Sequence, residues 1–180
     1  MKALLVVAPV ASLVVSMLVT GTTAAPASLP QASQAAKAVD YKLLAALLPN
    51  VPGWEKGDAN GEQSEMMGMT FSRAEAEYNK GDVNVRLEIT DTALIQGMLM
   101  PFTMMSSGLN EKTAEGYRRG TTVAGHPGWE EWENQTKNGD VNVLVAGRFI
   151  VHASGYDLPS MDPVKEIIAA LPAARLAALK

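Results

Sequence analysis

Methionine is the residue whose count stands out in this sequence, with 10 among 180 residues, while cysteine is absent. The thioether sulfur of methionine is a suitable ligand for Cu(I), so this chain could bind copper through methionine and histidine. Most of the methionines form two groups, which are Met66, Met67 and Met69, and Met98, Met100, Met104 and Met105. The alternative is packing, because methionine also fills irregular gaps in apolar cores and forms adaptable contact surfaces.

The spacing of the second group favours packing over metal binding. In a helix, Met98 and Met105 share a face with Phe102 and belong to the core. Met100 and Met104 are four residues apart and form a second pair outside that face. We therefore expect no metal site. The candidate contact surface for a partner or ligand consists of Leu99, Met100 and Met104.

Two tryptophans stand among three glutamates in the segment WEEWE, which begins at Trp129. Strand alternation would place Trp129, Glu131 and Glu133 on one face, and Glu130, Trp132 and Asn134 on the other. Paired carboxylates could hydrolyse glycosides or bind a cation, but the sequence places no second acid at the required separation. We expect a solvated strand with one buried tryptophan. Trp129 and Trp132 join the candidate contact residues.

The two histidines, His126 and His152, do not form a recognisable catalytic group. A general base needs a partner that orients it and a group to deprotonate. Ser154 and Asp157 follow His152 at two and five residues, which is not a triad spacing, and no G-x-S-x-G motif occurs. We expect both histidines to be structural or surface residues.

The composition limits the classes of function. A formal net charge of −4 opposes binding to nucleic acid or anionic lipid. The absence of cysteine excludes disulfides, thiolate metal sites and a cysteine nucleophile. No phosphate-binding glycine loop, zinc motif or basic stripe occurs, so we expect no cofactor and no nucleic-acid partner.

The first residues have the pattern of an export signal. Lys2 precedes the apolar stretch 3–19, and the small residues of 20–27 include Ala25-Pro26-Ala27, which fits signal-peptidase cleavage, with cleavage after Ala24 as an alternative. A retained anchor is the other interpretation, but the stretch is short and contains a proline. We predict a signal peptide over 1–27, a flexible leader over 28–39 and a single domain over 40–180. The mature protein would be periplasmic or secreted, without a stable membrane span.

Periodicity predicts three helices and a set of antiparallel strands in the mature chain. Asp40 caps the first helix, and Asp162-Pro163 opens the last. Asn138-Gly139 is the strongest short-range hairpin signal, and Gly147 is a candidate bulge. The expected elements are a helix from 40 to 48, strands over 64–78, 83–89, 116–123, 129–135 and 141–153, and helices over 92–107 and 162–171.

One pentapeptide, GDVNV, occurs twice, at 81–85 and at 139–143. Each copy would follow a turn and open a strand. A duplicated half is one interpretation. We favour convergent turn chemistry, because five residues are too few to establish a repeat.

The element order predicts an α+β fold, an antiparallel β-sheet built from hairpins with helices packed on it. The chain resembles the PsbP-like fold of small exported proteins in three features. These are the element order, the Gly125-His126-Pro127-Gly128 turn before a strand, and the closing amphipathic helix. The resemblance covers about residues 40–171 and implies a non-catalytic binding or assembly role. We therefore expect an exported binding or scaffolding domain for an unknown protein or an apolar small molecule. An enzyme using carboxylates and histidine, or a methionine-based Cu(I) carrier, are the alternatives.

Overall fold

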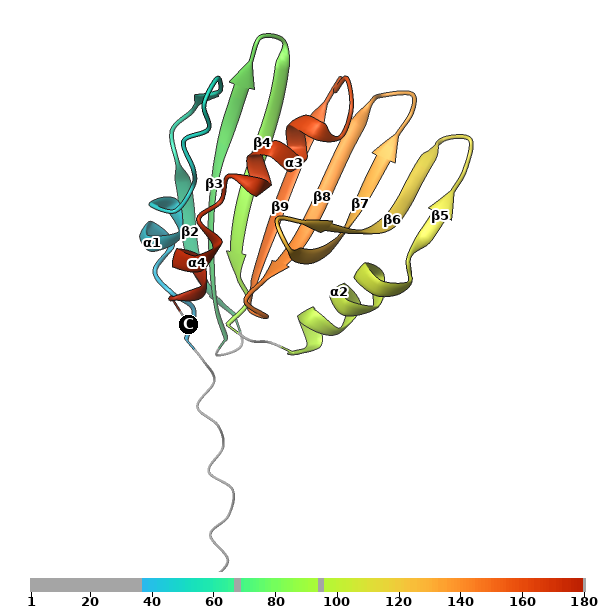
Figure 1. Ribbon diagram of the computed structural model, residues 1–180. Helices are drawn as coiled ribbons and strands as arrows, with labels where there is room; N and C mark the ends of the chain where they lie inside the picture. Colours follow the sequence, from blue (N-terminus) through green and yellow to red (C-terminus); the bar gives the residue numbers. More distant parts are fainter. Residues whose placement is uncertain (1–36, 67–68, 94–95, 180) are drawn as a thin grey trace, which may run out of the picture. The chain divides into compact units, whose positions relative to one another are not determined.

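The structure, a computed structural model, describes residues 37–66, 69–93 and 96–179, and one antiparallel sheet of nine strands organises this part of the chain (Figure 1). The strand order is β1-β3-β4-β9-β8-β7-β6-β5, and β2 also pairs with β3. The strands are β1 (Glu55–Lys56), β2 (Asn60–Met66), β3 (Met69–Lys80), β4 (Val83–Asp91), β5 (Asn110–Lys112), β6 (Gly116–Val123), β7 (His126–Glu133), β8 (Asn138–Val145) and β9 (Phe149–Tyr156). The helices are α1 (Tyr41–Ala45), α2 (Gln96–Gly108), α3 (Asp162–Ala169) and α4 (Ala173–Ala177). The predicted α+β class with an antiparallel sheet is confirmed.

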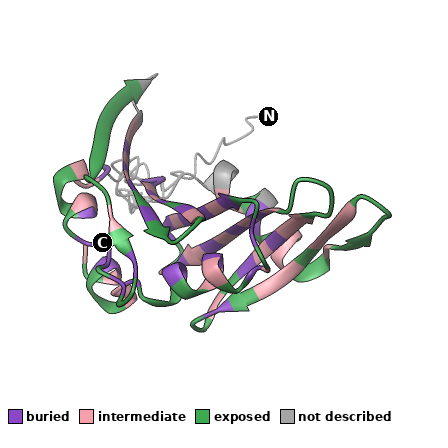
Figure 2. Cartoon of the chain, turned by 90° about the horizontal axis from the view of Figure 1, so that it is seen from above, coloured by how far each residue is buried: buried purple, intermediate pink, exposed green. Residues whose placement is uncertain are grey.

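One face of the sheet carries the hydrophobic core. Strand alternation places every second side chain of the central strands on this face, which gives the alternating burial visible in Figure 2. Helices α1, α3 and α4 contact the strands from this side (Figure 1). The strand residues that are fully buried here include Leu87 and Ile89 of β4, Val141 and Val143 of β8, and Val151 and Ala153 of β9. We call this side the core face.

The opposite side, which we call the polar face, carries the alternate side chains. Arg86, Glu88 and Thr90 of β4 pair in register with Ser154, His152 and Ile150 of β9. Ion pairs run between neighbouring strands here. They are Arg73–Glu62 at 2.8 Å, Arg86–Glu75, and Arg118–Glu131 at 3.0 Å. Ion pairs at such largely exposed positions each contribute little to stability.

Helix α2 lies against the polar face, over β6 and β7. Gly120 pairs in register with Trp129, and Trp129 with Asn142, which places all three on that face. A Cβ added to Gly120 would lie 2.4 Å from the carbonyl oxygen of Ser106 in α2. The helix thus packs directly on the backbone of β6, and its Phe102 is 6% exposed without belonging to the main core cluster.

Several predicted boundaries are wrong. The turn predicted at Gly125-His126-Pro127-Gly128 is the two-residue turn Ala124-Gly125, and residues 126–128 open β7. The helices predicted over 40–48, 92–107 and 162–171 are Tyr41–Ala45, Gln96–Gly108 and Asp162–Ala169. The strand predicted over 64–78 is two antiparallel strands, since Met66 of β2 pairs with Met69 of β3, and residues 67–68 lie outside the described ranges. Asn138-Gly139 lies inside β8, because the β7–β8 turn occupies 134–137 and uses Lys137 at φ 51°. Gly147 belongs to the reversal between β8 and β9 rather than to a bulge, so the predicted strand over 141–153 is two antiparallel strands.

The two GDVNV segments differ in their surroundings. Gly81 lies in the β3–β4 turn at φ 60°. Gly139 lies within β8, where an added Cβ would be 2.5 Å from the sulfur of Met161. The same five residues therefore occur in two settings, one where the glycine adopts a positive φ in a turn and one where it allows close packing within a strand.

Residues 37–39 contact the sheet and are the described part of the predicted leader. Ala38 is buried, and the amide of Val39 donates to the carboxylate of Asp91 at 2.7 Å. Arg148 donates to the carbonyl of Lys37 at 2.9 Å. The rest of the leader and the predicted signal peptide over 1–27 lie outside the described residues. Across the described ranges, no helix is long and apolar enough to cross a membrane.

Candidate functional site

The predicted contact surface on α2 faces solvent. Met100 is 66% exposed and Met104 is 70% exposed, and Leu99 is half-buried beside them. Side chains four residues apart in a helix are neighbours on one side, so the two thioethers form one patch. We call Leu99, Met100 and Met104 the α2 methionine surface.

No charged residue interrupts this surface. The segment 92–110, which includes all of α2, contains no Asp, Glu, Lys, Arg or His. The hydroxyls of the helix are also turned to its own backbone. Thr103 donates to the carbonyl of Met100 at 2.8 Å, and Ser106 and Ser107 donate to the carbonyl of Thr103 at 3.0 and 2.9 Å. An exposed helix of this kind offers a partner apolar and weakly polar contacts but no ionic ones.

The other side of α2 fixes the helix to the sheet. Phe102 is buried, and Met105 is half-buried. The backbone amide of Gly120 donates to the carbonyl of Leu109 at 2.9 Å, directly after the helix ends. The methionine surface therefore sits on an anchored helix, which lowers the entropic cost of binding a partner. The side chain of Met98, predicted in the core, lies outside the described residues.

The predicted tryptophans lie on opposite faces of the sheet. Trp129 is half-buried on the polar face, the same face that α2 covers. Trp132 is half-buried on the core face, and its indole N–H donates to Asn134 at 3.1 Å. The predicted alternation is correct for residues 129–133, but the expectation of one buried tryptophan is wrong. The fully buried side chain of this strand is Glu130.

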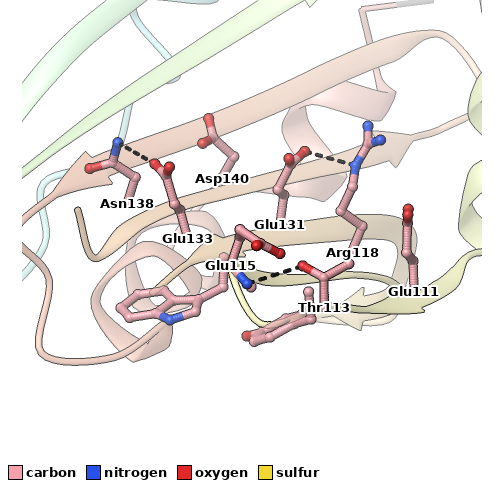
Figure 3. Close-up of a pocket in the computed structure, with 11 residues that line it drawn as sticks. Glu111, Thr113, Glu115, Arg118, Glu131, Glu133, Asn138 and Asp140 are labelled. Atoms are coloured by element: carbon pink, nitrogen blue, oxygen red, sulfur yellow. Dashed lines mark hydrogen bonds and ion pairs between the residues drawn. The ribbon is translucent and has the colours of Figure 1, made fainter. Parts of the chain in front are cut away.

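A hollow of about 430 Å³ opens on the polar face at the ends of β5 to β8 (Figure 3). Glu131 and Glu133 of β7 and Asp140 of β8 point into it, and Arg118 pairs with Glu131 at its side (Figure 3). The hollow is strongly acidic. Within the described part of the chain, no three His, Cys, Asp or Glu residues are placed to hold a metal ion.

His152 has one carboxylate partner. Its Nε2 lies 2.9 Å from Oδ1 of Asp140, and it lines a second polar-face hollow of about 370 Å³. Ser154 is on the same face, but two residues along a strand separate its Cα from that of His152 by about 6.6 Å. His126 pairs with Val123 and so faces the core side. The two histidines therefore do not share a site.

The buried charges are the functional-looking groups that the sequence analysis missed. Glu130 is fully buried, with Oε1 at 2.6 Å from Nη2 of Arg119 and Oε2 at 2.5 Å from Nζ of Lys165 in α3. Burial raises the pKa of Glu130, but hydrogen bonds from Lys165 and Arg119 outweigh it, so its pKa lies below the usual value. The available signal was strand alternation, which places Glu130 on the same face of β7 as Trp132.

Comparison with known proteins gives no relative from which a role could be transferred. No protein-family model matches the chain, and neither a curated protein nor a solved structure matches it. The function therefore has to be argued from the surface itself.

Proposed function

We propose that this protein is a non-catalytic binding domain that docks a partner protein on the α2 methionine surface. The observation that carries the proposal is the exposure of Met100 and Met104, 66% and 70%, on a helix anchored from its other side. Protein interfaces are enriched in methionine and depleted of charge at their centres, which is the composition found here. Flexible thioether side chains also adapt to partners of differing shape.

A protein partner fits this surface better than an apolar small molecule. Small apolar ligands bind in concave sites that enclose most of their surface. Four hollows of the structure are lined mostly by charged and polar residues, and none of these four is lined by a residue of α2. The thioethers instead point outward, so the ligand has to bring its own apolar surface to them.

The proposal includes an exported location and a PsbP-like fold. We propose that residues 1–27 direct export and that the domain acts in the periplasm or outside the cell. The PsbP-like resemblance, which implies binding or assembly functions, is part of the same proposal. It is supported by an antiparallel sheet with helices on both faces.

A catalytic role has one observation in its favour, the hydrogen-bonded pair of Asp140 and His152 beside a hollow. Catalysis by such a pair requires a nucleophile or substrate proton within hydrogen-bond reach of the imidazole. The nearest candidate on the same strand, Ser154, lies two residues along β9 and forms no hydrogen bond with the imidazole of His152. We therefore rank an enzyme below a binding domain.

The docking proposal can be tested by site-specific photo-cross-linking in cells that produce the full chain. A photoreactive amino acid at Ser107, which is exposed three residues beyond Met104, should give an adduct of one defined mass. The same probe at Tyr156, 66% exposed on the sheet, should not give that adduct. Introducing charge with Met100→Glu and Met104→Glu should abolish the adduct at Ser107, because the buried interface would then contain unpaired carboxylates.

A matched control uses another exposed apolar residue. Leu43 in α1 is 49% exposed, and Leu43→Glu should leave the adduct at Ser107 unchanged. An adduct that persists in the double glutamate variant, or the absence of any adduct at Ser107, would contradict the proposal.

A further inference from the structure

We propose that Met100 and Met104 form an oxidation site, at which a peroxide converts both thioethers to sulfoxides and switches off the α2 methionine surface. The effect on a partner rests on the proposed function. The chemistry itself depends only on the accessibility of the two sulfurs.

Access to solvent distinguishes Met100 and Met104 from Met105 and Met161, the other methionines whose side chains the structure describes. Oxidation of methionine follows solvent exposure, since the peroxide must reach the sulfur. Met100 and Met104 are 66% and 70% exposed, whereas Met161, directly before α3, is 7% exposed and Met105 is half-buried. The chain has no cysteine, so no thiol competes for the oxidant.

The reaction balances with hydrogen peroxide as the oxidant. A sulfur lone pair attacks one peroxide oxygen, the O–O bond breaks, and that oxygen forms a new bond to sulfur. Proton transfer to the departing hydroxide releases water. The sulfur loses two electrons and the peroxide gains them, once for each methionine. Methionine sulfoxide reductases reverse the change, so the site can cycle between two states.

Oxidation should change the polarity of the α2 methionine surface strongly and the stability of the fold only slightly. The segment 92–110 carries no charge, and the hydroxyls of Thr103, Ser106 and Ser107 are bonded to the helix backbone, so two sulfoxides would add strongly polar groups to this surface. A sulfoxide is polar and accepts hydrogen bonds from water, and burying it without a donor is unfavourable. Phe102, which anchors the helix, is unchanged by the reaction.

The test treats the purified protein with limiting hydrogen peroxide and follows each methionine by peptide mass spectrometry. Met100 and Met104 should each gain one oxygen atom at a rate on the order of tenfold above that of Met161. The apolar surface is measured separately, as retention on a phenyl-substituted column. Retention should fall as Met100 and Met104 are oxidised, while the unfolding temperature stays constant.

Leucine variants separate oxidation from other damage. Met100→Leu with Met104→Leu keeps the apolar surface but removes both sulfurs, so column retention should become insensitive to peroxide. Met161→Leu is the control and should respond as the unmodified protein does. Equal oxidation rates at Met100, Met104 and Met161, or unchanged retention after oxidation of both exposed sulfurs, would overturn the proposal. Neither result depends on the cross-linking experiment, so the two proposals fail independently.

Discussion

Asp91 at the end of β4 and Arg148 in the turn directly before β9 form a buried two-point ion pair, with Nε–Oδ1 at 2.7 Å and Nη2–Oδ2 at 2.8 Å. Both side chains are almost fully buried. The pair also holds the N-terminal segment, because Asp91 accepts from Val39 and Arg148 donates to the carbonyl of Lys37. It therefore connects three parts of the chain at one edge of the core.

Replacing Arg148 by methionine should destabilise the fold by about 3–5 kcal/mol, because it leaves the Asp91 carboxylate buried without its cation. Chemical denaturation measures the free energy of unfolding. Arg73→Met is the control. Its guanidinium forms exposed pairs with Glu62 and Glu88, so the loss should be about 1 kcal/mol or less. Equal losses in the free energy of unfolding for the two variants would show that the buried pair stabilises the fold no more than an exposed one.

Glu130 should make the stability of the protein depend on pH in the acid range. Its folded pKa lies below the value of about 4.3 for an unfolded glutamic acid, so folding favours the ionised form. The resulting stabilisation is fully present above about pH 4.3 and is lost as the pH falls through the folded pKa. Glu130→Gln should lower the free energy of unfolding at neutral pH by about 1–3 kcal/mol and flatten this acid loss.

The control for this prediction is Glu131→Gln, on the same strand but half-buried on the polar face. It should keep the acid dependence of the unmodified protein. If unfolding of Glu130→Gln keeps the same dependence on pH, another carboxylate is responsible for it.

The sequence predicted the elements better than their connections, for a physical reason. Val83, Val85, Leu87 and Ile89 alternate strictly, and one face of β4 is buried, so periodicity alone identifies this strand. Turns often require a positive φ, and apart from glycine and asparagine few residue types indicate that a position adopts it. Ala124 and Ala146 have φ of 51° and 56°, and nothing in an alanine predicts that conformation.

The charged core groups were unpredictable for a different reason. Arg148 follows Gly147, and its partners, Asp91 and the carbonyl of Lys37, are distant in the sequence, so no local pattern indicates that it is buried. The α2 methionine surface was predictable, since the spacing of Met100 and Met104 sets them apart from the face of Phe102. What periodicity could not give is the side of the sheet on which the helix lies, which Gly120 and its missing Cβ reveal.

The two alanines at the hairpin turns should be stabilising sites. Ala124-Gly125 and Ala146-Gly147 each have two successive positive φ angles, the pattern of a type I′ turn. Asparagine tolerates this conformation better than alanine, so Ala124→Asn and Ala146→Asn should each raise the free energy of unfolding by about 0.5–1 kcal/mol. Thermal and chemical denaturation should agree on the sign. Ala178→Asn, at φ −74° after α4, should give no such gain.

Gly120 should control the seating of α2. In Gly120→Ala the new Cβ would lie 2.4 Å from the backbone oxygen of Ser106, and a backbone atom cannot move aside cheaply. We expect a loss of about 1–3 kcal/mol and faster hydrogen exchange in α2. Gly57→Ala is the matched control, because its nearest contact would be an ordinary 3.6 Å to the oxygen of Glu77. Unaltered exchange in α2 would mean that the helix is not held by β6.

The two sides of α2 should separate stability from binding. Phe102→Ala removes a buried ring and should cost about 3–5 kcal/mol, or release α2 locally if the sheet remains folded. Met100→Ser with Met104→Ser alters exposed side chains only and should change the free energy of unfolding by about 0.5 kcal/mol or less. Denaturation measures the first quantity, and the cross-link at Ser107 measures the second. The serine variant should retain full stability while losing the adduct, because two polar hydroxyls replace the apolar contact. A large loss of stability in the serine variant would instead place Met100 and Met104 in the core and remove the basis for a docking surface on this helix.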